Sequence, residues 1–399
     1  MLLRLNVLYQ PNSLDVLCWT SVYYFLLQYI RSNQTKWLYI LAIVFAIGFL
    51  NKYNIVFLFL GILPAIGLSS ARKLLYNGHF YGALLLALLL VFPNLLWQYQ
   101  HRFPVFLHLR ELAETQLSHV NRWTFITSPF LFFSGSLLVL LVGLYALARQ
   151  DGWRRYRLFL WSFIFTFALF VALKAKDYYA IGLYPIYFAF GATYIGRLLA
   201  DSKWYYCTAV VLLPIVFFLP IYDVAFPNKT PAYIVTHQDA YRKLGLLRWE
   251  DGKEHSLPQD FADMLGWKEL ARKVDSVYLQ LGAPEHTLVL CDNYGQAGAI
   301  NYYSSCGVQA VSFNADYINW FDLEKDYKHL IRVKNSHEEL EEMRQTGPLF
   351  QQSVVAAHIQ NPYAREYGTV IFSFRDANVD INQRIRNELL AQPTYFNKQ

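Results

Sequence analysis

The stretch KAKDYYAIGLYP, residues 174–185, places cationic and aromatic residues between apolar sequence on both sides. The flanking runs, 157–173 and 178–199, are each near the roughly 20 mostly apolar residues that a membrane-spanning helix needs. Charged side chains next to hydrocarbon are costly, and in membrane proteins they commonly mark functional sites. The stretch therefore predicts a helical membrane protein with a polar site at one face of the bilayer.

The composition supports a membrane protein. Apolar residues make up 55% of the 399 positions and charged residues only 16%, a balance too apolar for an ordinary soluble protein of this length. The apolar excess lies before residue 223, and no soluble fold buries so many apolar runs in succession. We expect about eight transmembrane helices, at 14–30, 37–50, 53–69, 81–98, 127–148, 157–173, 178–199 and 204–222.

Basic residues indicate the orientation in the membrane. With eight spans, ten basic residues fall in short loops on one side, which is cytoplasmic by the positive-inside rule. The opposite, extracytoplasmic side then carries the start of the chain, the turn at Lys52, the loop 99–126, the loop 174–179 and everything after 223. A chain that starts outside is unusual. The ten basic residues are Arg31, Lys36, Arg72, Lys73, Arg149, Arg154, Arg155, Arg157, Arg197 and Lys203.

The C-terminal part reads as a soluble domain. The turn sequence PNKTP at 227–231 marks a boundary, which divides a transmembrane domain at 1–222 from an extracytoplasmic domain at 223–399. Short apolar runs alternate with helical patterns, which favours an α/β fold. The strands expected are 287–291, 329–333, 353–359 and 369–374, and the helices are 267–281, 337–345 and 381–390.

Other sequence features limit the function. No Walker loop, dinucleotide-binding fingerprint, nucleophile elbow or zinc-protease helix is present. The glycines of 293–298 fit a tight strand-to-helix turn. Cys18 and Cys207 read as thiols in the membrane part, whereas a disulfide between Cys291 and Cys306 is left open. The net charge of +6 comes from the cytoplasmic loops and predicts no nucleic-acid partner.

The polar residues on the extracytoplasmic side suggest a ligand. A lipid-linked phosphate at the membrane surface would explain cations on the side that is normally poor in them, with aromatic residues packing against lipid or sugar. Snorkelling of long side chains to lipid headgroups is the alternative. The loop 99–126 also has helical periodicity, and such a helix would either floor a substrate cavity or act as a brace. The polar set comprises Asp15, Lys52, His101, Arg102, His108, Arg110, Glu111, Glu114, His119, Arg122, Lys174, Lys176, Asp177, Tyr178 and Tyr179.

These motifs resemble those of a known enzyme family. The chain resembles bacterial members of glycosyltransferase family 39, integral-membrane GT-C enzymes related to protein O-mannosyltransferases and to the lipid A aminoarabinose transferase. The resemblance covers most of the chain, and the motifs are specific only jointly. They are YQPNSLDVLCW at 9–19, GFLNKY at 48–53, PNLLWQYQ at 93–100, KDYY at 176–179 with Tyr184-Pro185, FADMLGW at 261–267 and NYGQAGAI at 293–300.

The resemblance implies transfer of a sugar from a polyprenyl-phosphate donor to an extracytoplasmic lipid, glycan or protein acceptor, with inversion at the anomeric carbon. It also implies a multi-pass protein of the bacterial inner membrane. Such chemistry needs cations for the departing phosphate and a carboxylate to accept a proton. A divalent metal is left open. The residues predicted to bind the donor phosphate and lipid are Lys52, Arg102, Lys174, Lys176, Tyr178 and Tyr179.

The catalytic carboxylate is the weak part of this prediction. In the family the principal acidic residue follows the first span, and the resemblance implies that roughly three N-terminal spans precede the region that this chain matches. We therefore expect the chain to be N-terminally incomplete. Asp15 is the one carboxylate in the membrane part nominated as catalytic, either orienting the true base or binding a metal. The alternative is a non-catalytic membrane protein that binds a lipid-linked sugar or resembles a transporter.

Overall fold

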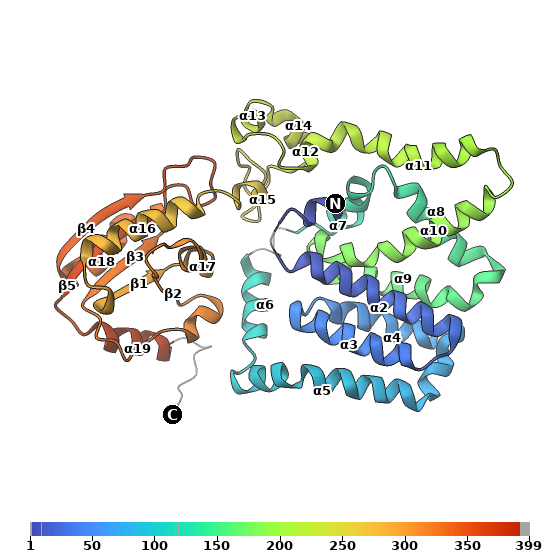
Figure 1. The fold of residues 1–399 in the computed structure, drawn as a ribbon, viewed down its shortest axis with the longest axis horizontal. Coiled ribbons are helices and arrows are strands. Elements are labelled where there is room, and N and C mark those ends of the chain that lie inside the picture. The colour runs from blue at the N-terminus through green and yellow to red at the C-terminus, as the bar shows by residue number, and fades with distance from the viewer. Residues whose placement is uncertain (1, 9, 116, 118–119, 392–399) are drawn as a thin grey trace. The chain divides into compact units, whose positions relative to one another are not determined.

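The computed structural model describes residues 2–8, 10–115, 117 and 120–391 (Figure 1). The chain forms two compact units, Met1–Lys229 and Thr230–Gln399. Each unit has its own core and is described by itself.

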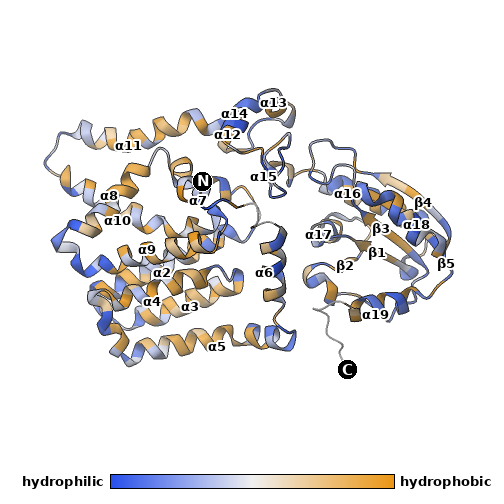
Figure 2. Cartoon of the chain, turned by 180° about the vertical axis from the view of Figure 1, so that it is seen from behind, coloured by the Kyte–Doolittle hydropathy of each residue, from blue (hydrophilic) through white to orange (hydrophobic). Residues whose placement is uncertain are grey.

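The first unit is built of helices joined by short turns (Figure 1). Most are rich in apolar residues along their whole length (Figure 2). Their bounds are α1 Leu2–Leu5, α2 Asn12–Ser32, α3 Lys36–Asn51, α4 Ile55–Gly67, α5 Gly78–Gln100, α6 Pro104–Thr115, α7 Arg122–Phe132, α8 Leu137–Arg149, α9 Arg157–Ala172, α10 Pro185–Leu198, α11 Trp204–Phe218 and α12 Tyr222–Ala225, with 3₁₀ segments η1 Ser70–Tyr76, η3 Asp151–Tyr156, η4 Asp177–Leu183 and η5 Leu219–Ile221.

Three helical stretches are long and apolar enough to cross a membrane: Gly78–Gln100, Asp151–Ala172 and Trp204–Ala225. Two further apolar pairs bend sharply, by 104° between α4 and η1 and by 108° between α7 and α8, and would raise the number to five if each were one span. The described residues therefore support a helical membrane protein with three to five candidate spans. The eight expected spans are not shown, because helices such as α3, with 16 residues, are shorter than a bilayer crossing requires.

Large side chains at the centre hold the bundle together. Helix α2 packs on α3, α3 on α5, and α4 on α9. A hydroxyl network joins α2, α9 and α10: the Tyr23 hydroxyl lies 2.8 Å from Ser162 Oγ, and the Tyr187 hydroxyl lies 3.3 Å from Tyr23 and donates to the Phe159 carbonyl at 2.8 Å. Apolar association is weak between helices in lipid, so such hydrogen bonds help to select the partners.

Two glycines allow α8 and α10 to cross in close contact. A Cβ on Gly143 would collide with the Tyr187 carbonyl, and a Cβ on Gly191 would collide with the Val139 carbonyl. The two backbones therefore meet without side chains between them, which is the packing that small residues permit in membranes.

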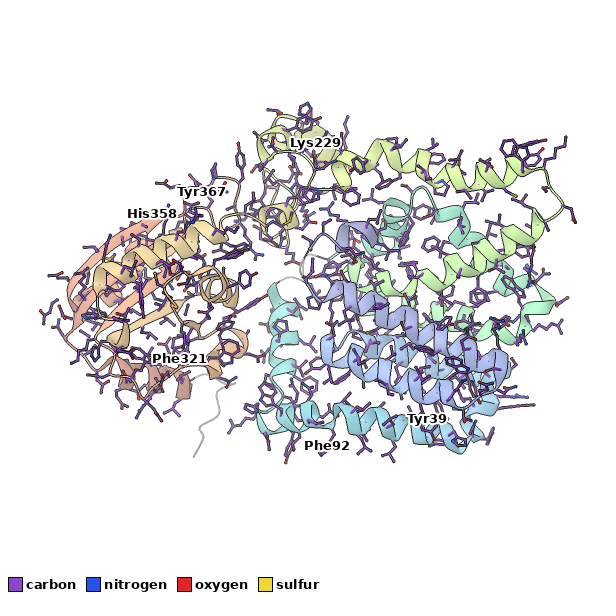
Figure 3. The ribbon with its side chains drawn as sticks, in the orientation of Figure 1. Tyr39, Phe92, Lys229, Phe321, His358 and Tyr367 are labelled. Carbon is purple, nitrogen blue, oxygen red and sulfur yellow. The ribbon has the colours of Figure 1, made fainter. Side chains whose placement is uncertain are left out.

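Helices α5 and α11 lie at the edge of the first unit. Phe92 on α5 is 52% exposed (Figure 3), and every side chain of α11 is at least partly exposed. Apolar surfaces of this extent fit contact with lipid.

The second unit contains a five-stranded sheet in the order β2-β1-β3-β5-β4. Strand β1 pairs in parallel with β2 and β3, whereas β5 pairs antiparallel with β3 and β4. The bounds are β1 Thr287–Cys291, β2 Ala310–Ser312, β3 His329–Lys334, β4 Phe350–His358 and β5 Val370–Ala377, with helices α13 Pro231–Thr236, α14 Gln238–Lys243, α15 Gln259–Ala262, α16 Trp267–Leu281, α17 Tyr294–Tyr303, α18 Glu339–Thr346 and α19 Ile381–Ala391.

Helices cover both faces of this sheet. Residues of α16 and α17 pack with β1 and β3 in one apolar cluster, and residues of α19 pack with β5 in the other (Figure 1). The α/β character expected from the sequence is present. Cys291 is buried and Cys306 half-buried, and both are free thiols, so the structure contains no disulfide between them.

The α8–α10 crossing can be tested with two glycines of the same helix. Gly191→Ala should destabilise the protein by about 1–3 kcal/mol, because the added methyl meets backbone atoms that cannot move aside. Gly196→Ala is the control, because no atom lies within 4 Å of a Cβ at that position, and its better helix propensity should leave stability equal or slightly higher. Thermal unfolding in detergent measures both. Equal losses in the two variants would contradict the close crossing.

A carboxylate in the second unit gives a pH-dependent prediction. Glu269 of α16 accepts hydrogen bonds from the Lys273 ammonium at 2.7 Å and from the Gln360 and Asn361 N–H groups at 2.8 and 3.3 Å. Partial burial opposes ionisation, but these donors together hold the pKa of Glu269 below its usual value.

Glu269→Gln should therefore weaken the protection of α16 amides from hydrogen exchange at neutral pH, by about 1–3 kcal/mol. Because the pKa of Glu269 is lower in the folded state, its contribution to stability is fully present at pH values above the ordinary carboxyl pKa. The advantage of Glu269 should disappear as pH falls through its lower, folded-state pKa. Glu341→Gln in α18 is the control. A difference that persists unchanged in acid would contradict the assignment.

Candidate functional site

Three segments of the first unit bring the polar site together. Helix α3 ends at Asn51, and Lys52 adopts an extended conformation, with φ −159° and ψ 124°, before α4 begins. Segment η4 follows Lys174, whose φ of 53° turns the chain sharply after α9. The helices on either side of Lys52, α3 and α4, pack against α2, and so does η4. The break at Lys52 therefore places a cation beside the start of α2 and the tyrosines of η4.

The Lys52 ammonium is held by an amide and two aromatic rings. Its Nζ donates to Asn12 Oδ1 at 2.6 Å and lies 4.3 Å from the ring centre of Tyr179 and 5.4 Å from that of Tyr178. Within the described ranges no carboxylate lies close enough to form an ion pair with it. Cation–π contacts offset part of the cost of burying the charge, but they leave the net charge in place.

A second cation shares the same aromatic surface. Lys176 Nζ lies 5.9 Å from the ring centre of Tyr178, and the Tyr178 and Tyr179 rings meet nearly perpendicular, 4.8 Å apart. The Asp177 carboxylate accepts a hydrogen bond from the Tyr178 N–H at 2.8 Å, which fixes the first turn of η4. The structure thus brings Lys52, Lys176 and the two tyrosines into one cluster, hereafter the lysine–tyrosine cluster.

Asp15 is linked to this cluster through Asn54. It is 4% exposed, and its two oxygens accept hydrogen bonds from Trp19 Nε1 and Asn54 Nδ2, both at 3.0 Å. Asn54 Nδ2 also donates to the Tyr179 carbonyl at 2.9 Å. Asp15 therefore fixes the position of Tyr179 through Asn54, and its carboxylate is not presented at the surface.

Two predicted site residues lie outside the cluster. Lys174 is half-buried, and in the part of the chain that the structure describes its side chain forms no hydrogen bond or ion pair. Arg102 is exposed in the turn between α5 and α6, with φ 56°. The helix expected in the loop 99–126 is present as α6. Tyr9 and His119 lie outside the described residues.

Sequence reasoning missed the amides that organise the site. Asn12 and Asn54 are 6% exposed each and connect Lys52, Asp15 and η4. Asn12 was part of a quoted motif, and Asn54 stands two residues after the lysine that interrupts two apolar runs. A polar residue at the break between two apolar runs was the feature of the sequence that could have identified Asn54. Asn54 Oδ1 is buried and accepts no hydrogen bond from the described residues.

A second polar group extends from the same break to α5. The Tyr53 hydroxyl donates to Asn94 Oδ1 at 2.9 Å and accepts from Gln98 Nε2 at 2.9 Å. The Val105 N–H donates to Gln98 Oε1 at 3.3 Å. Residues of the PNLLWQYQ motif therefore fix the end of α5 and the start of α6 relative to the Lys52 break.

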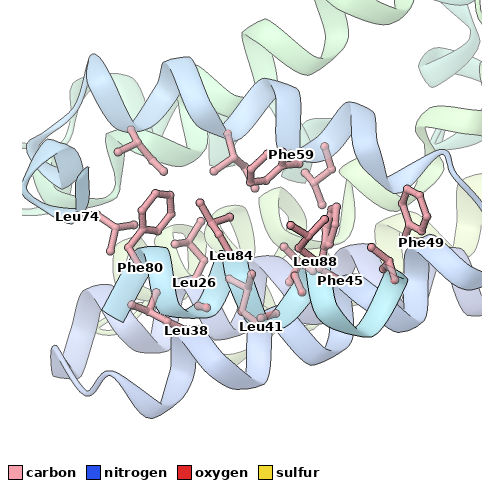
Figure 4. Close-up of a pocket in the computed structure, with 18 of the residues that line it drawn as sticks. Leu26, Leu38, Leu41, Phe45, Phe49, Phe59, Leu74, Phe80, Leu84 and Leu88 are labelled. Atoms are coloured by element: carbon pink, nitrogen blue, oxygen red, sulfur yellow. The ribbon is translucent and has the colours of Figure 1, made fainter. Parts of the chain in front are cut away.

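An apolar pocket begins near this break. It has a volume of about 250 Å³ and is lined entirely by apolar side chains of α2, α3, α4, α5 and η1. Phe49 lies at one end and Leu74 at the other (Figure 4), and the Phe49 ring lies 4.8 Å from the ring of Tyr53. The pocket offers space for hydrocarbon within one helical turn of Lys52.

The described residues contain no group of three or more His, Cys, Asp or Glu side chains that could hold a metal ion. The lysine–tyrosine cluster offers cations and aromatic faces, which suit an anionic ligand. The cluster can neutralise the charge of such a ligand and pack against its apolar parts.

Comparison with known protein families gives a match to part of the chain. Residues 1–97 match the family model of dolichyl-phosphate-mannose-protein mannosyltransferase. The matched region contains Asn12, Asp15, Lys52 and Asn54. This match supports a membrane glycosyltransferase of the GT-C superfamily, the coarser form of the resemblance expected from the motifs. No curated protein and no solved structure matches the chain.

The role of Asp15 can be tested by removing its carboxylate. Asp15→Ala should destabilise the first unit by about 2–4 kcal/mol, because the buried Trp19 and Asn54 donors lose their acceptor. Thermal unfolding in detergent measures the loss, and chemical labelling of tyrosines should show Tyr179 becoming more reactive. Asp151→Ala is the control, since that carboxylate is 79% exposed in a surface pair with Arg154. Unchanged stability of Asp15→Ala would contradict the anchoring role.

Proposed function

We propose that this protein is a membrane glycosyltransferase of bacterial family 39. It takes a sugar from a polyprenyl-phosphate donor and transfers it to an extracytoplasmic lipid, glycan or protein acceptor. The observation that carries the proposal is the charge of Lys52, with which no described carboxylate forms an ion pair and which stands three residues after Phe49, a wall residue of the apolar pocket. A lipid-linked phosphate combines the two properties that this arrangement would bind.

The lysine–tyrosine cluster would hold the phosphate. Lys52 donates one hydrogen bond to Asn12, and an ammonium has three donors. Charge-assisted hydrogen bonds to a phosphate are stronger than neutral ones, and cations there stabilise the negative charge that develops as the sugar leaves. Lys176 adds a second cation, and Tyr178 and Tyr179 offer faces for a sugar or an isoprenoid. Lys174 and Arg102 would contribute charge near the site.

The apolar pocket would take part of the polyprenyl chain. An engineered protein cavity of about 150 Å³ with aliphatic and aromatic walls stays dry and binds hydrocarbon. This pocket, at about 250 Å³, is larger and has similar walls (Figure 4). The phosphate at Lys52 and the chain near Phe49 would then lie about one helical turn apart.

Asp15 would serve as a positioning residue in this reaction. Its burial and its two hydrogen bonds support a role in aligning Asn54 and Tyr179, whereas a proton acceptor must reach the acceptor group. The same burial favours a second candidate, a protein that binds the lipid-linked sugar without transferring it.

The membrane arrangement completes the proposal. All eight apolar segments would lie within the bacterial inner membrane, and the second unit would be extracytoplasmic. The helical character of each segment supports this arrangement, as does the collection of basic residues in short loops on one side.

Binding of a labelled polyprenyl-phosphate mannose to the full chain in nanodiscs tests the proposal. Lys52→Gln should weaken binding roughly 10- to 100-fold, because a charge-assisted hydrogen bond to the phosphate is lost. Lys36→Gln is the matched control: Lys36 stands at the other end of the same helix, also over an aromatic ring, that of Trp37 at 4.9 Å. Its variant should bind normally.

Equal binding by wild type and Lys52→Gln would overturn the phosphate site. A second measurement, transfer of the label to membrane acceptors, separates the two candidates. Binding with transfer supports the enzyme, and binding without transfer supports the non-catalytic protein.

A further inference from the structure

A second cavity lies at the other end of α2 and shares Leu26 and Leu74 with the apolar pocket. It has a volume of about 170 Å³ and is lined by the end of α2, by η1 and by Arg155 of η3. Asp15 stands at the start of α2 and Asn33 directly after its end, so the two sites are roughly 25–30 Å apart along the helix. Its polar wall residues are Tyr29, Asn33, Ser70, Lys73 and Arg155.

The cavity is strongly cationic. Lys73 and Arg155 form no ion pair within the described part of the chain, and the sequence holds no Asp or Glu anywhere from residue 16 to residue 110. The nearby carboxylate of Asp151 pairs with Arg154 at 2.9 Å. The carboxyl end of α2 adds about half a negative charge, so two full cations outweigh it.

The polar groups of the cavity are held in place. The Arg155 guanidinium lies 4.7 Å from the ring centre of Tyr156, a residue that is 9% exposed. The Tyr29 hydroxyl accepts a hydrogen bond from Asn77 Nδ2 at 3.1 Å and keeps its own proton to donate. A guanidinium offers paired donors that match phosphate oxygens, and an ammonium adds a mobile donor beside them.

The remaining wall of the cavity is apolar. Leu26 and Leu74 are 2% and 4% exposed, and Ile30 lies between them on the wall. A free phosphate gains nothing from such a surface, whereas a phospholipid places hydrocarbon next to its phosphate. We propose that this cavity binds the phosphate group of an anionic phospholipid, through Lys73 and Arg155.

The test compares two charge-matched double variants of the full chain. Lys73→Gln with Arg155→Gln removes the two cations of the cavity. Arg72→Gln with Arg154→Gln removes the same charge from the adjacent positions, which are exposed like Lys73 and Arg155 but do not line the cavity. Native mass spectrometry counts retained phosphatidylglycerol, and thermal shift follows its titration into detergent-solubilised protein. Phosphatidylcholine and inorganic phosphate are titrated in parallel.

Phosphatidylglycerol should bind wild type and the Arg72/Arg154 variant alike. The Lys73/Arg155 variant should bind it about 25-fold more weakly, since each cation near a lipid surface contributes about fivefold. Each single variant should show about a fivefold loss, and unchanged melting without lipid shows that the fold is intact. The Lys73/Arg155 variant should still bind the labelled polyprenyl-phosphate mannose normally, so failure of this proposal and failure of the donor site are distinguishable.

Three results would overturn the proposal. Equal losses in the two double variants would mean attraction by general surface charge. Equal binding of phosphatidylcholine would mean that the phosphate's net charge is not recognised. Saturation by inorganic phosphate at the same concentration would identify a free anion as the ligand in place of a lipid.

Discussion

One cation in the middle of an apolar sequence governs the first unit. Lys52 interrupts two hydrophobic helices, and its ammonium needs polar or aromatic partners because hydrocarbon provides none. Asn12 and the two tyrosines supply them. That requirement brings the start of α2, the α3–α4 break and η4 to one place, although they are far apart in the sequence.

The partners of Lys52 are neutral, and this is the chemically informative point. A buried ion pair would satisfy the cation and leave little attraction for an anion. Here the nearby carboxylate, Asp15, bonds to Trp19 and Asn54 instead. Asp15 therefore fixes the geometry of the site without forming an ion pair with Lys52, and the Lys52 ammonium remains available to an anionic ligand.

The sequence alone identified those members of the lysine–tyrosine cluster that charge and hydrophobicity make conspicuous. Lys52, Lys176, Tyr178 and Tyr179 stand out because they interrupt apolar runs. The amides of Asn12 and Asn54 carry no charge and have no periodic signal, so their role depends on contacts between distant segments. Lys174 and Arg102 were grouped with the site because they fall in loops expected on the same side of the membrane, but positive φ angles at both positions turn the chain in ways that loop position does not reveal.

The same distinction applies to secondary structure. Helix α16 begins and ends at the predicted residues, because its apolar residues recur at helical spacing along its whole length. Strand β2 has only three residues, too few for any pattern. A tight strand-to-helix turn was expected at 293–298, and α17 begins within it, at Tyr294. The described residues show three to five candidate spans where eight were expected, and apolar length in the sequence does not reveal the bends after α4 and α7.

The hydroxyl network of Tyr23, Ser162 and Tyr187 also fixes the rotation of α2 about its own axis. A helix turns by about 100° per residue, so a slip of a single position would swing the Tyr23 hydroxyl away from both partners. Asp15, Trp19 and Tyr23 stand four residues apart on one face of that helix. The hydrogen bonds of the Tyr23 hydroxyl thus fix which face of α2 points toward the break between α3 and α4. Asp15, two turns away on the same face, is thereby held in position to accept the hydrogen bond from Asn54.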